Sequence, residues 1–234
     1  MGTTMYDILL QLPLFQGLCE DDLTNILEKV KFHFSKHKAG EKILRAGEVC
    51  DKLVFLLKGK VSAERTNSNP LFTCCEYFNA PYLVEPYSLF GMNTEYISSY
   101  IAQTDVELLT VDKSYISSEL NNYPIFRINY MNIISNHAQI LDNKLWQIKE
   151  MNDYSCVINF ILFHCEKPGG RKLLRIKMEH LALILGHTRS TISKVLNKLQ
   201  AEGLIVLRRK EIEIPKAELL VESLQTNSAF TAEL

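Results

Sequence analysis

The sequence predicts an α+β fold made of an N-terminal β-roll, a long helix and a C-terminal helix-turn-helix that carries a wing. Three observations support this order of elements. Short strand-like segments separated by turn residues fill positions 32–110, and an uninterrupted helical stretch begins at Pro124. Near the C-terminus, two short helices are joined by a turn that contains Gly186. The 234 residues are enough for one large or two modest domains.

The composition is that of an ordinary folded protein, because 47% of the residues are hydrophobic and 23% are charged. This balance excludes a disordered chain. The densest apolar stretch, Cys156 to Cys165, is interrupted by Asn159 and His164 and is shorter than the roughly 18 apolar residues that a membrane span requires. The start of the chain has no basic region ahead of its apolar residues, so we expect no secretory signal and a cytoplasmic location.

The six cysteines are scattered along the chain, without a CxxC pair or short Cys and His spacings typical of a zinc site. This usage favours a reducing compartment and predicts no metal. The adjacent Cys74 and Cys75 leave two alternatives, a redox or soft-metal element and a purely structural role. Because neighbouring residues of a strand point to opposite faces, the structural interpretation is favoured.

The charge is distributed unevenly along the chain. Residues 1–150 and 211–234 each carry a net charge of −4, whereas residues 151–210 hold 11 basic and 4 acidic residues, a net charge of +7. The overall charge of −1 therefore hides one basic segment. Such a segment is typical of a surface that binds polyanions, although an ordinary solvated face is the alternative until a motif is found there.

The N-terminal half begins with helical patterns and continues with strands. Met5, Ile8, Leu9 and Leu12 share one helical face, and acidic residues 20–22 precede a second helix up to Val30. Six strand-like segments follow: Ile43–Arg45, Leu53–Lys58, Lys60–Glu64, Leu71–Tyr77, Tyr100–Ala102 and Val106–Val111. Many short strands with regular turns predict a β-roll or a sandwich.

The helix that opens at Pro124 runs to about Met151 without glycine or a further proline. Apolar residues repeat along it every seven positions, and polar residues share the complementary positions, as in a coiled coil. We expect a dimer interface made of Tyr130, Ile134, His137, Leu141, Lys144 and Ile148. The alternative is a helix packed entirely on its own domain. No second ligand lies near His137 on that face, so we interpret it as a structural residue.

The basic segment contains a helix-turn-helix pattern. A first helix spans Glu179–Leu185, Gly186 ends it, and Thr188 caps a second helix that runs from Arg189 to about Ala201. After Gly203, two alternating segments flank three consecutive basic residues, which predicts a hairpin, or wing, with a basic tip.

The exposed side of the second helix and the wing tip supply groups that bind nucleic acid. Lys and Arg neutralise phosphates, hydroxyl groups bind phosphate oxygens, and an Arg at the start of a helix in the major groove donates two hydrogen bonds to guanine. The candidate DNA-binding residues are Thr188, Arg189, Ser190, Thr191, Ser193, Lys194, Asn197, Lys198, Arg208, Arg209 and Lys210.

These residues closely resemble the winged helix-turn-helix of the cyclic-AMP receptor protein and Fnr (Crp/Fnr) family of bacterial transcription regulators. The matching run is Leu181-Ala182-x-x-x-Gly186-x-Thr188-Arg189-x-Thr191-Ile192-Ser193-Lys194-x-Leu196-x-x-Leu199-x-x-x-Gly203-Leu204-Ile205. The resemblance extends to Pro13–Leu18, to the glycines at 40, 47 and 59, and to the long helix. It implies a cyclic-nucleotide-binding-like β-roll (jelly roll), a dimerisation helix, phosphate contacts from Thr188 and Thr191, and a base contact from Arg189. The family often has Glu and Arg where this sequence has Ser190 and Lys194, so we expect a different preferred half-site.

The resemblance also bears on the effector. Family members that bind cyclic AMP carry a Gly-Glu segment and, further on, an Arg-Ser or Arg-Thr pair, which correspond here to residues 84–91 and 97–100. By this resemblance Glu85, Ser98 and Ser99 fall at ligand positions, but the arginine that pairs with the cyclic phosphate is missing. We therefore do not expect classical cyclic AMP binding. An iron-sulfur cluster is not expected either, because the N-terminal region has no group of closely spaced cysteines.

The predicted organisation is an effector domain at residues 1–122, a dimerisation helix at 123–151 and a DNA-binding domain at 152–234. The predicted function is a homodimeric, sequence-specific transcription regulator that binds a pseudo-palindromic double-stranded operator, with RNA polymerase and an unidentified small-molecule effector as further candidate partners. The alternative is a ligand sensor or scaffold whose DNA contact is incidental. An enzyme is not predicted, because the sequence contains neither HExxH nor GxSxG.

Overall fold

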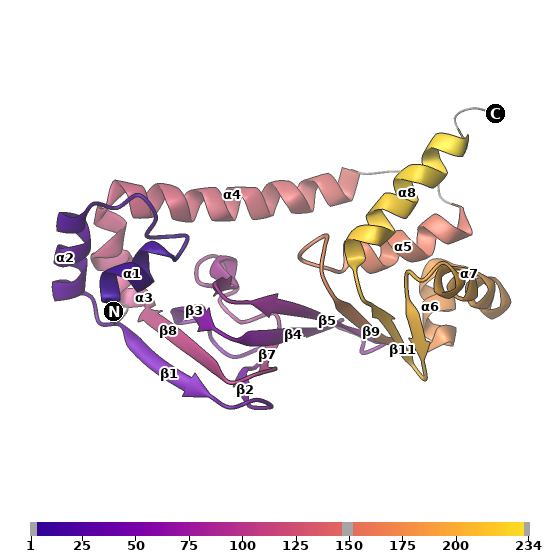
Figure 1. The fold of residues 1–234 in the computed structure, drawn as a ribbon, viewed down its shortest axis with the longest axis horizontal. Coiled ribbons are helices and arrows are strands. Elements are labelled where there is room, and N and C mark those ends of the chain that lie inside the picture. The colour runs from indigo at the N-terminus through magenta and orange to yellow at the C-terminus, as the bar shows by residue number, and fades with distance from the viewer. Residues whose placement is uncertain (1–3, 147–151, 232–234) are drawn as a thin grey trace. The chain divides into compact units, whose positions relative to one another are not determined.

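The computed structural model describes residues 4–146 and 152–231, with side chains to residue 224 (Figure 1). The chain divides into two compact units. The N-terminal unit contains Met1–Ser62 and Phe78–Trp146, and the C-terminal unit contains Ala63–Tyr77 and Gln147–Leu234. The division differs from the sequence-based boundaries in two respects. Residues 63–77 group with the C-terminal part of the chain, and the long helix up to Trp146 groups with the N-terminal unit rather than forming a part of its own.

The N-terminal unit is built from short antiparallel strands, in agreement with the predicted β-roll. One sheet has the order β1-β8-β3-β6, and β4, β7 and β2 are neighbours in that order in a second sheet. Gly59, between β3 and β4, has a φ of +91°, and a Cβ there would lie 2.5 Å from the Asp105 carbonyl oxygen, so this turn requires glycine. The strands up to α4, of which β4 and β5 extend into the C-terminal unit, are β1 (His33–His37), β2 (Lys42–Leu44), β3 (Lys52–Lys58), β4 (Lys60–Thr66), β5 (Phe72–Asn79), β6 (Tyr82–Val84), β7 (Ser99–Ala102) and β8 (Val106–Asp112).

Aromatic packing joins the helices of the N-terminal unit to its sheets. The ring of Phe15 lies 6.0 Å from that of Phe55 in β3 and 5.4 Å from that of Phe126 in α4. The helices are α1 (Met5–Leu10), α2 (Glu20–Lys29), η1 (Pro86–Ser88), α3 (Lys113–Ser118), η2 (Leu120–Asn122) and α4 (Pro124–Trp146). Among the described residues of α4, Phe126 alone is buried, so the other side chains described on this long helix are half-buried or exposed.

The C-terminal unit is a winged helix fold, as the sequence predicted. Its helices bury a continuous apolar core against the strand order β10-β11-β9-β5. The elements are α5 (Asp153–Phe163), β9 (Lys172–Ile176), α6 (Met178–Leu185), α7 (Arg189–Ala201), β10 (Val206–Arg208), β11 (Glu211–Ile214) and α8 (Ala217–Thr231).

The tip of the β4–β5 hairpin belongs to the C-terminal unit because β5 pairs with β9, from Phe72 opposite Ile176 to Glu76 opposite Lys172. Side chains hold the pair together. Glu76 and Lys172 form a buried ion pair, and the ring of Phe72 lies 5.2 Å from that of Phe160 in α5. The sequence identified the strand at 71–77 but assigned it to the N-terminal domain, since strand periodicity does not specify the pairing partner.

The vicinal cysteines are buried in β5. The Sγ of Cys74 lies 3.9 Å from that of Cys165, and this neighbour together with burial raises the pKa of Cys74. Both facts agree with the structural interpretation, because a thiol of raised pKa is a poor nucleophile. Within the described ranges, no three His, Cys, Asp or Glu side chains group in a way that could hold a metal ion. None of the helices described there combines the length and apolar content of a membrane span.

Candidate nucleic-acid interface and effector site

The helix-turn-helix forms from local signals. Leu181 and Ala182 of α6 and Ile192 and Leu199 of α7 are buried, and this shared core fixes the two helices against each other. The turn between them is three residues long. The backbone N–H of His187 donates to the carbonyl of Ala182 across 3.0 Å, which closes the end of α6.

Both predicted caps are present. Gly186 ends α6 in the left-handed region, with φ of +69° and ψ of +25°. The hydroxyl of Thr188 accepts a hydrogen bond from the backbone N–H of Thr191 across 3.2 Å and so caps α7. The N-terminus of α7 carries no acidic residue in its first turn, so its positive dipole end stays uncompensated and attracts an anion.

The predicted DNA-binding residues all lie at the surface of the C-terminal unit. Ser190, Lys194 and Asn197 are exposed and fall on one stripe of α7, because they are spaced at i, i+4 and i+7. Arg189 is exposed beside this stripe. Of the other predicted DNA-binding residues, Thr191 and Ser193 are half-buried. The exposed ones are Thr188, Lys198, Arg208, Arg209 and Lys210.

Ion pairs divide the basic residues into two groups. Lys198 lies 3.9 Å from Glu202 and 4.7 Å from the Tyr154 ring centre, and Arg208 donates to Glu213 across 3.0 Å. In contrast, neither Arg189 nor Lys194 has a carboxylate partner among the residues that the structure describes. Their charges are the ones that an external anion would meet first.

The wing is the β10–β11 hairpin, in which Arg208 pairs with Glu211 across a two-residue turn. Lys210 adopts a positive φ of +63° in this turn, and both turn residues are exposed. The predicted basic tip is therefore present, with Arg209 and Lys210 at its end.

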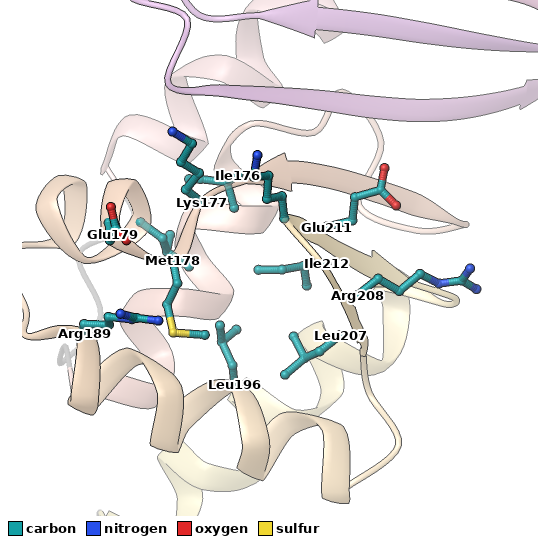
Figure 2. A pocket seen from close by; sticks show the side chains of 12 residues that line it. Ile176, Lys177, Met178, Glu179, Arg189, Leu196, Leu207, Arg208, Glu211 and Ile212 are labelled. Carbon is teal, nitrogen blue, oxygen red and sulfur yellow. The ribbon is translucent and has the colours of Figure 1, made fainter.

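A pocket of about 350 Å³ separates the wing from the N-terminal ends of α6 and α7 (Figure 2). Apolar and charged side chains line it in equal number. Met178, Leu196 and Leu207 are among the apolar ones, and the Arg189 side chain extends beside Met178.

The predicted effector residues in the N-terminal unit form an arrangement that the sequence did not indicate. Glu85 is 1% exposed, and four groups of its own chain donate hydrogen bonds to its carboxylate. We call this set the Glu85 cradle. The donors are the backbone N–H groups of Ile97 (2.8 Å) and Ser98 (2.9 Å) and the hydroxyls of Ser88 (3.1 Å) and Tyr100 (3.2 Å).

The third predicted effector residue, Ser99, lies elsewhere: its hydroxyl accepts from the backbone N–H of Ala46 across 3.0 Å. The structure thus brings Glu85 and Ser98 together but not Ser99. Sequence reasoning missed Tyr100 and Ser88 as members of the cradle. The inward position of Tyr100 in the alternating strand β7 is the signal that could have identified it.

The segment after Glu85 packs on α4. The hydroxyl of Tyr130 donates to the Pro86 carbonyl across 2.6 Å, and the ring of Tyr87 stacks on His137 at 4.0 Å. Burial raises the pKa of Tyr130 to about 12, so its hydroxyl keeps its proton at neutral pH. Tyr130 and His137, two of the predicted dimer residues, therefore contact η1 of their own chain.

The other predicted dimer residues differ in their surroundings. Ile134 and Lys144 are half-buried, Leu141 is 47% exposed, and Ile148 lies outside the described residues. Further exposed apolar residues occur along α4, among them Met131 and Leu145. The helix thus presents an apolar surface next to the face that packs on η1.

The fold and its exposed basic helix define a class of protein, a transcription regulator with a helix-turn-helix DNA-binding domain. Comparison with known families supports this class. Residues 157–223 match the Crp-like helix-turn-helix domain, and residues 34–123 match the cyclic nucleotide-binding domain. The chain belongs to the Crp/Fnr family.

Individual relatives support the same family assignment. The chain is 25% identical over 215 residues to a cyclic AMP receptor protein of Thermus thermophilus, covering 90% of this chain and 95% of the relative. It is 22% identical over 181 residues to a global nitrogen regulator of Synechocystis, covering 72% and 78%. The crystal structure of the Thermus thermophilus catabolite activator protein has the same fold, with a TM-score of 0.52, 24% identity and coverage of 90% and 97%.

Proposed function

We propose that this chain is a homodimeric transcription regulator that binds a pseudo-palindromic double-stranded DNA site with sequence specificity. The observation that carries the proposal is the exposed side of α7. There Arg189 and Lys194 have no carboxylate partner among the described residues, and the capped N-terminus of the helix adds a positive dipole. Cations of this kind exchange solvent counterions for DNA phosphates, and the release of those counterions drives binding.

The residues of the interface divide into those that contact bases and those that contact backbone phosphates. Arg189, the first residue of α7, is placed to donate two hydrogen bonds to a guanine in the major groove. The stripe of Ser190, Lys194 and Asn197 follows the same groove. The hydroxyls of Thr188, Thr191 and Ser193, the ammonium of Lys198 and the wing residues Arg208, Arg209 and Lys210 bind backbone phosphates, which sets the register without reading the sequence.

A dimer is supported by the apolar surface of α4. Because Tyr130 and His137 contact η1, we place the partner-facing seam one residue further around the helix, at Met131, Ala138 and Leu145, together with Ile134 and Leu141. These five positions follow the heptad spacing of two interlocking helices. In such a dimer we expect the two copies of α7 to enter successive major grooves, about 34 Å apart.

The test is selection of bound duplexes from a random pool by the full chain at about 0.1 M salt. We expect enrichment of an inverted repeat whose half-site centres lie about 10 base pairs apart. The Arg189→Ala variant should lose this enrichment, whereas Lys36→Ala, which removes a charge from β1, should keep it. A wild-type pool without an enriched sequence contradicts the proposal.

A further inference from the structure

We infer that the anion site of the β-roll is filled by the chain's own Glu85, which acts as a built-in ligand in place of a diffusible anion. The inference concerns how the proposed DNA-binding function is regulated. Only the DNA-affinity measurement described below depends on that proposed function. According to this inference, the Glu85 cradle binds a carboxylate, and the wild-type site does not bind cyclic phosphates.

The number and type of donors match a carboxylate. An ionised carboxylate only accepts hydrogen bonds, and its two oxygens offer about four lone-pair positions. In the cradle, Oε1 accepts from the Ser98 N–H and the Tyr100 hydroxyl, while Oε2 accepts from the Ile97 N–H and the Ser88 hydroxyl. Both oxygens therefore have two donors each, and the set is complete.

The cradle stabilises a charge in the absence of a cation. Glu85 is 1% exposed and forms no ion pair within the described chain, so dipoles alone offset its charge. A second anion at this place would find its donors occupied and would lie against a like charge, which is strongly unfavourable in a buried site. A cyclic phosphate therefore enters only if the Glu85 side chain leaves.

The backbone of Glu85 supports the same conclusion. Its φ of +34° and ψ of +56° lie in the left-handed region, which residues with a side chain adopt infrequently. Glycine would fit this conformation without strain. The four hydrogen bonds of the cradle hold the Glu85 side chain in place. They therefore offset the backbone strain that a residue with a side chain has in this conformation.

The cradle is connected to α4, the helix that carries the proposed seam. The segment that follows Glu85 contacts α4 through Pro86 with Tyr130 and through Tyr87 with His137. The ring of Phe90 also lies 6.0 Å from that of Tyr130. Occupation of the cradle by Glu85 therefore keeps η1 packed on α4 without any external effector.

The experiment uses the full chain, the Glu85→Ala and Glu85→Gln variants, and the exposed Glu95→Ala as a matched control. Sodium acetate and cyclic AMP are the probes, with sodium chloride at equal ionic strength as the reference. We expect the wild type and Glu95→Ala to bind neither probe in calorimetric titration. Glu85→Ala opens a space for a carboxylate, so acetate should bind it and raise its melting temperature in a saturable way.

The second readout is affinity for the selected duplex. We expect Glu85→Ala to weaken DNA binding about 5- to 150-fold, the usual range of coupling between two sites, and acetate to restore it. Glu85→Gln keeps the side-chain volume but turns an amide NH₂ towards a donor, so it should weaken DNA binding without acetate rescue. If Glu85→Ala does not fold, the Glu85→Gln variant and the wild-type titrations still decide.

Saturable cyclic AMP binding by the wild type that is lost in Glu85→Ala would overturn the inference, because Glu85 would then be a contact for a diffusible ligand. Unchanged DNA affinity in both Glu85 variants would overturn the coupling to α4. The two proposals fail separately. A wild type that selects no duplex refutes the regulator, whereas the acetate titration reports on the cradle with no DNA present.

Discussion

The Glu85 cradle and the exposed side of α7 use charge in opposite ways. In the N-terminal unit a buried carboxylate meets four donors of its own chain, whereas on α7 Arg189 and Lys194 carry exposed charges that no described carboxylate offsets. A buried charge must be satisfied inside the fold because its desolvation is unfavourable. An exposed charge keeps its water until a ligand displaces it. The Glu85 cradle thus satisfies an anion of the chain itself, whereas the exposed side of α7 offers its charges to an external one.

The largest expected effect tests the rule that buried charges depend on their partners. Lys172 is 2% exposed and is paired with Glu76. Lys172→Ala leaves a buried carboxylate without its cation, so the free energy of unfolding should fall by about 3 to 5 kcal/mol. Chemical denaturation of the full chain measures it. The exposed pair of Lys36 and Glu107 is the control, and Lys36→Ala should change stability by less than about 1 kcal/mol. Equal losses in the two variants would refute the contrast.

The next effect concerns the apolar surface of α4, which is exposed in the single chain. Leu141→Asp places a charge in the proposed seam and removes the burial of a side chain that is 47% exposed in the monomer. A two-fold axis places this residue in the seam twice, so the lost apolar burial counts twice. The free energy of dimerisation should therefore become less favourable by about 2 to 3 kcal/mol. Sedimentation equilibrium measures the dissociation constant. Asn143→Asp, which adds the same charge to an exposed position on the opposite side of α4, should leave it unchanged.

A smaller effect separates the two groups of basic residues on α7. Arg189→Ala should reduce the preference for the selected duplex over a scrambled one by about 1 to 3 kcal/mol and relax the specificity at one base pair. Lys198→Ala should weaken both duplexes alike and reduce the salt dependence, since the proposed contact of this ammonium is with a backbone phosphate. Fluorescence anisotropy at two salt concentrations measures both variants. Equal losses on both duplexes for Arg189→Ala would exclude it as a base reader.

The smallest effect is a pH dependence at the contact between η1 and α4. Burial raises the pKa of Tyr130 to about 12, so the folded state favours the protonated phenol. This contribution is fully present below pH 10 and is lost as the pH rises to about 12. Between these values the wild type should lose about 1 kcal/mol more stability than Tyr130→Phe, after allowance for solvent screening of a partly exposed group. Identical pH profiles would place Tyr130 in solvent.

The helix-turn-helix could be predicted almost completely from the sequence because its signals are local. Gly186, the Thr188 cap and the buried spacing of α7 all act within a few residues of the helices they define. The pairing of β5 with β9 could not be predicted in this way. A strand such as 71–77 fits either sheet by its periodicity, and the Glu76–Lys172 pair that selects β9 joins residues 96 positions apart.

The candidate sites show the same limit. The family resemblance indicated Glu85 as a contact for a ligand, but its donors lie up to 15 residues away in sequence and two of them are backbone groups, which carry no residue signature. On α4, the heptad spacing identified Ile134 and Leu141 but did not decide which neighbouring stripe faces a partner. The contact of His137 with Tyr87 shows which stripe packs on the chain's own η1, and the proposed seam is placed beside it for that reason.

The placement of residues 63–77 bears on how this protein can be dissected. A fragment that starts at residue 152 lacks β5, so one edge of β9 would have open hydrogen-bonding groups and Lys172 would lose its counter-charge. Such a truncation removes a strand from the middle of a sheet. An autonomous DNA-binding module therefore requires residues 63–77 to be grafted onto it, for example by circular permutation, whereas simple deletion of the N-terminal half yields an aggregation-prone product.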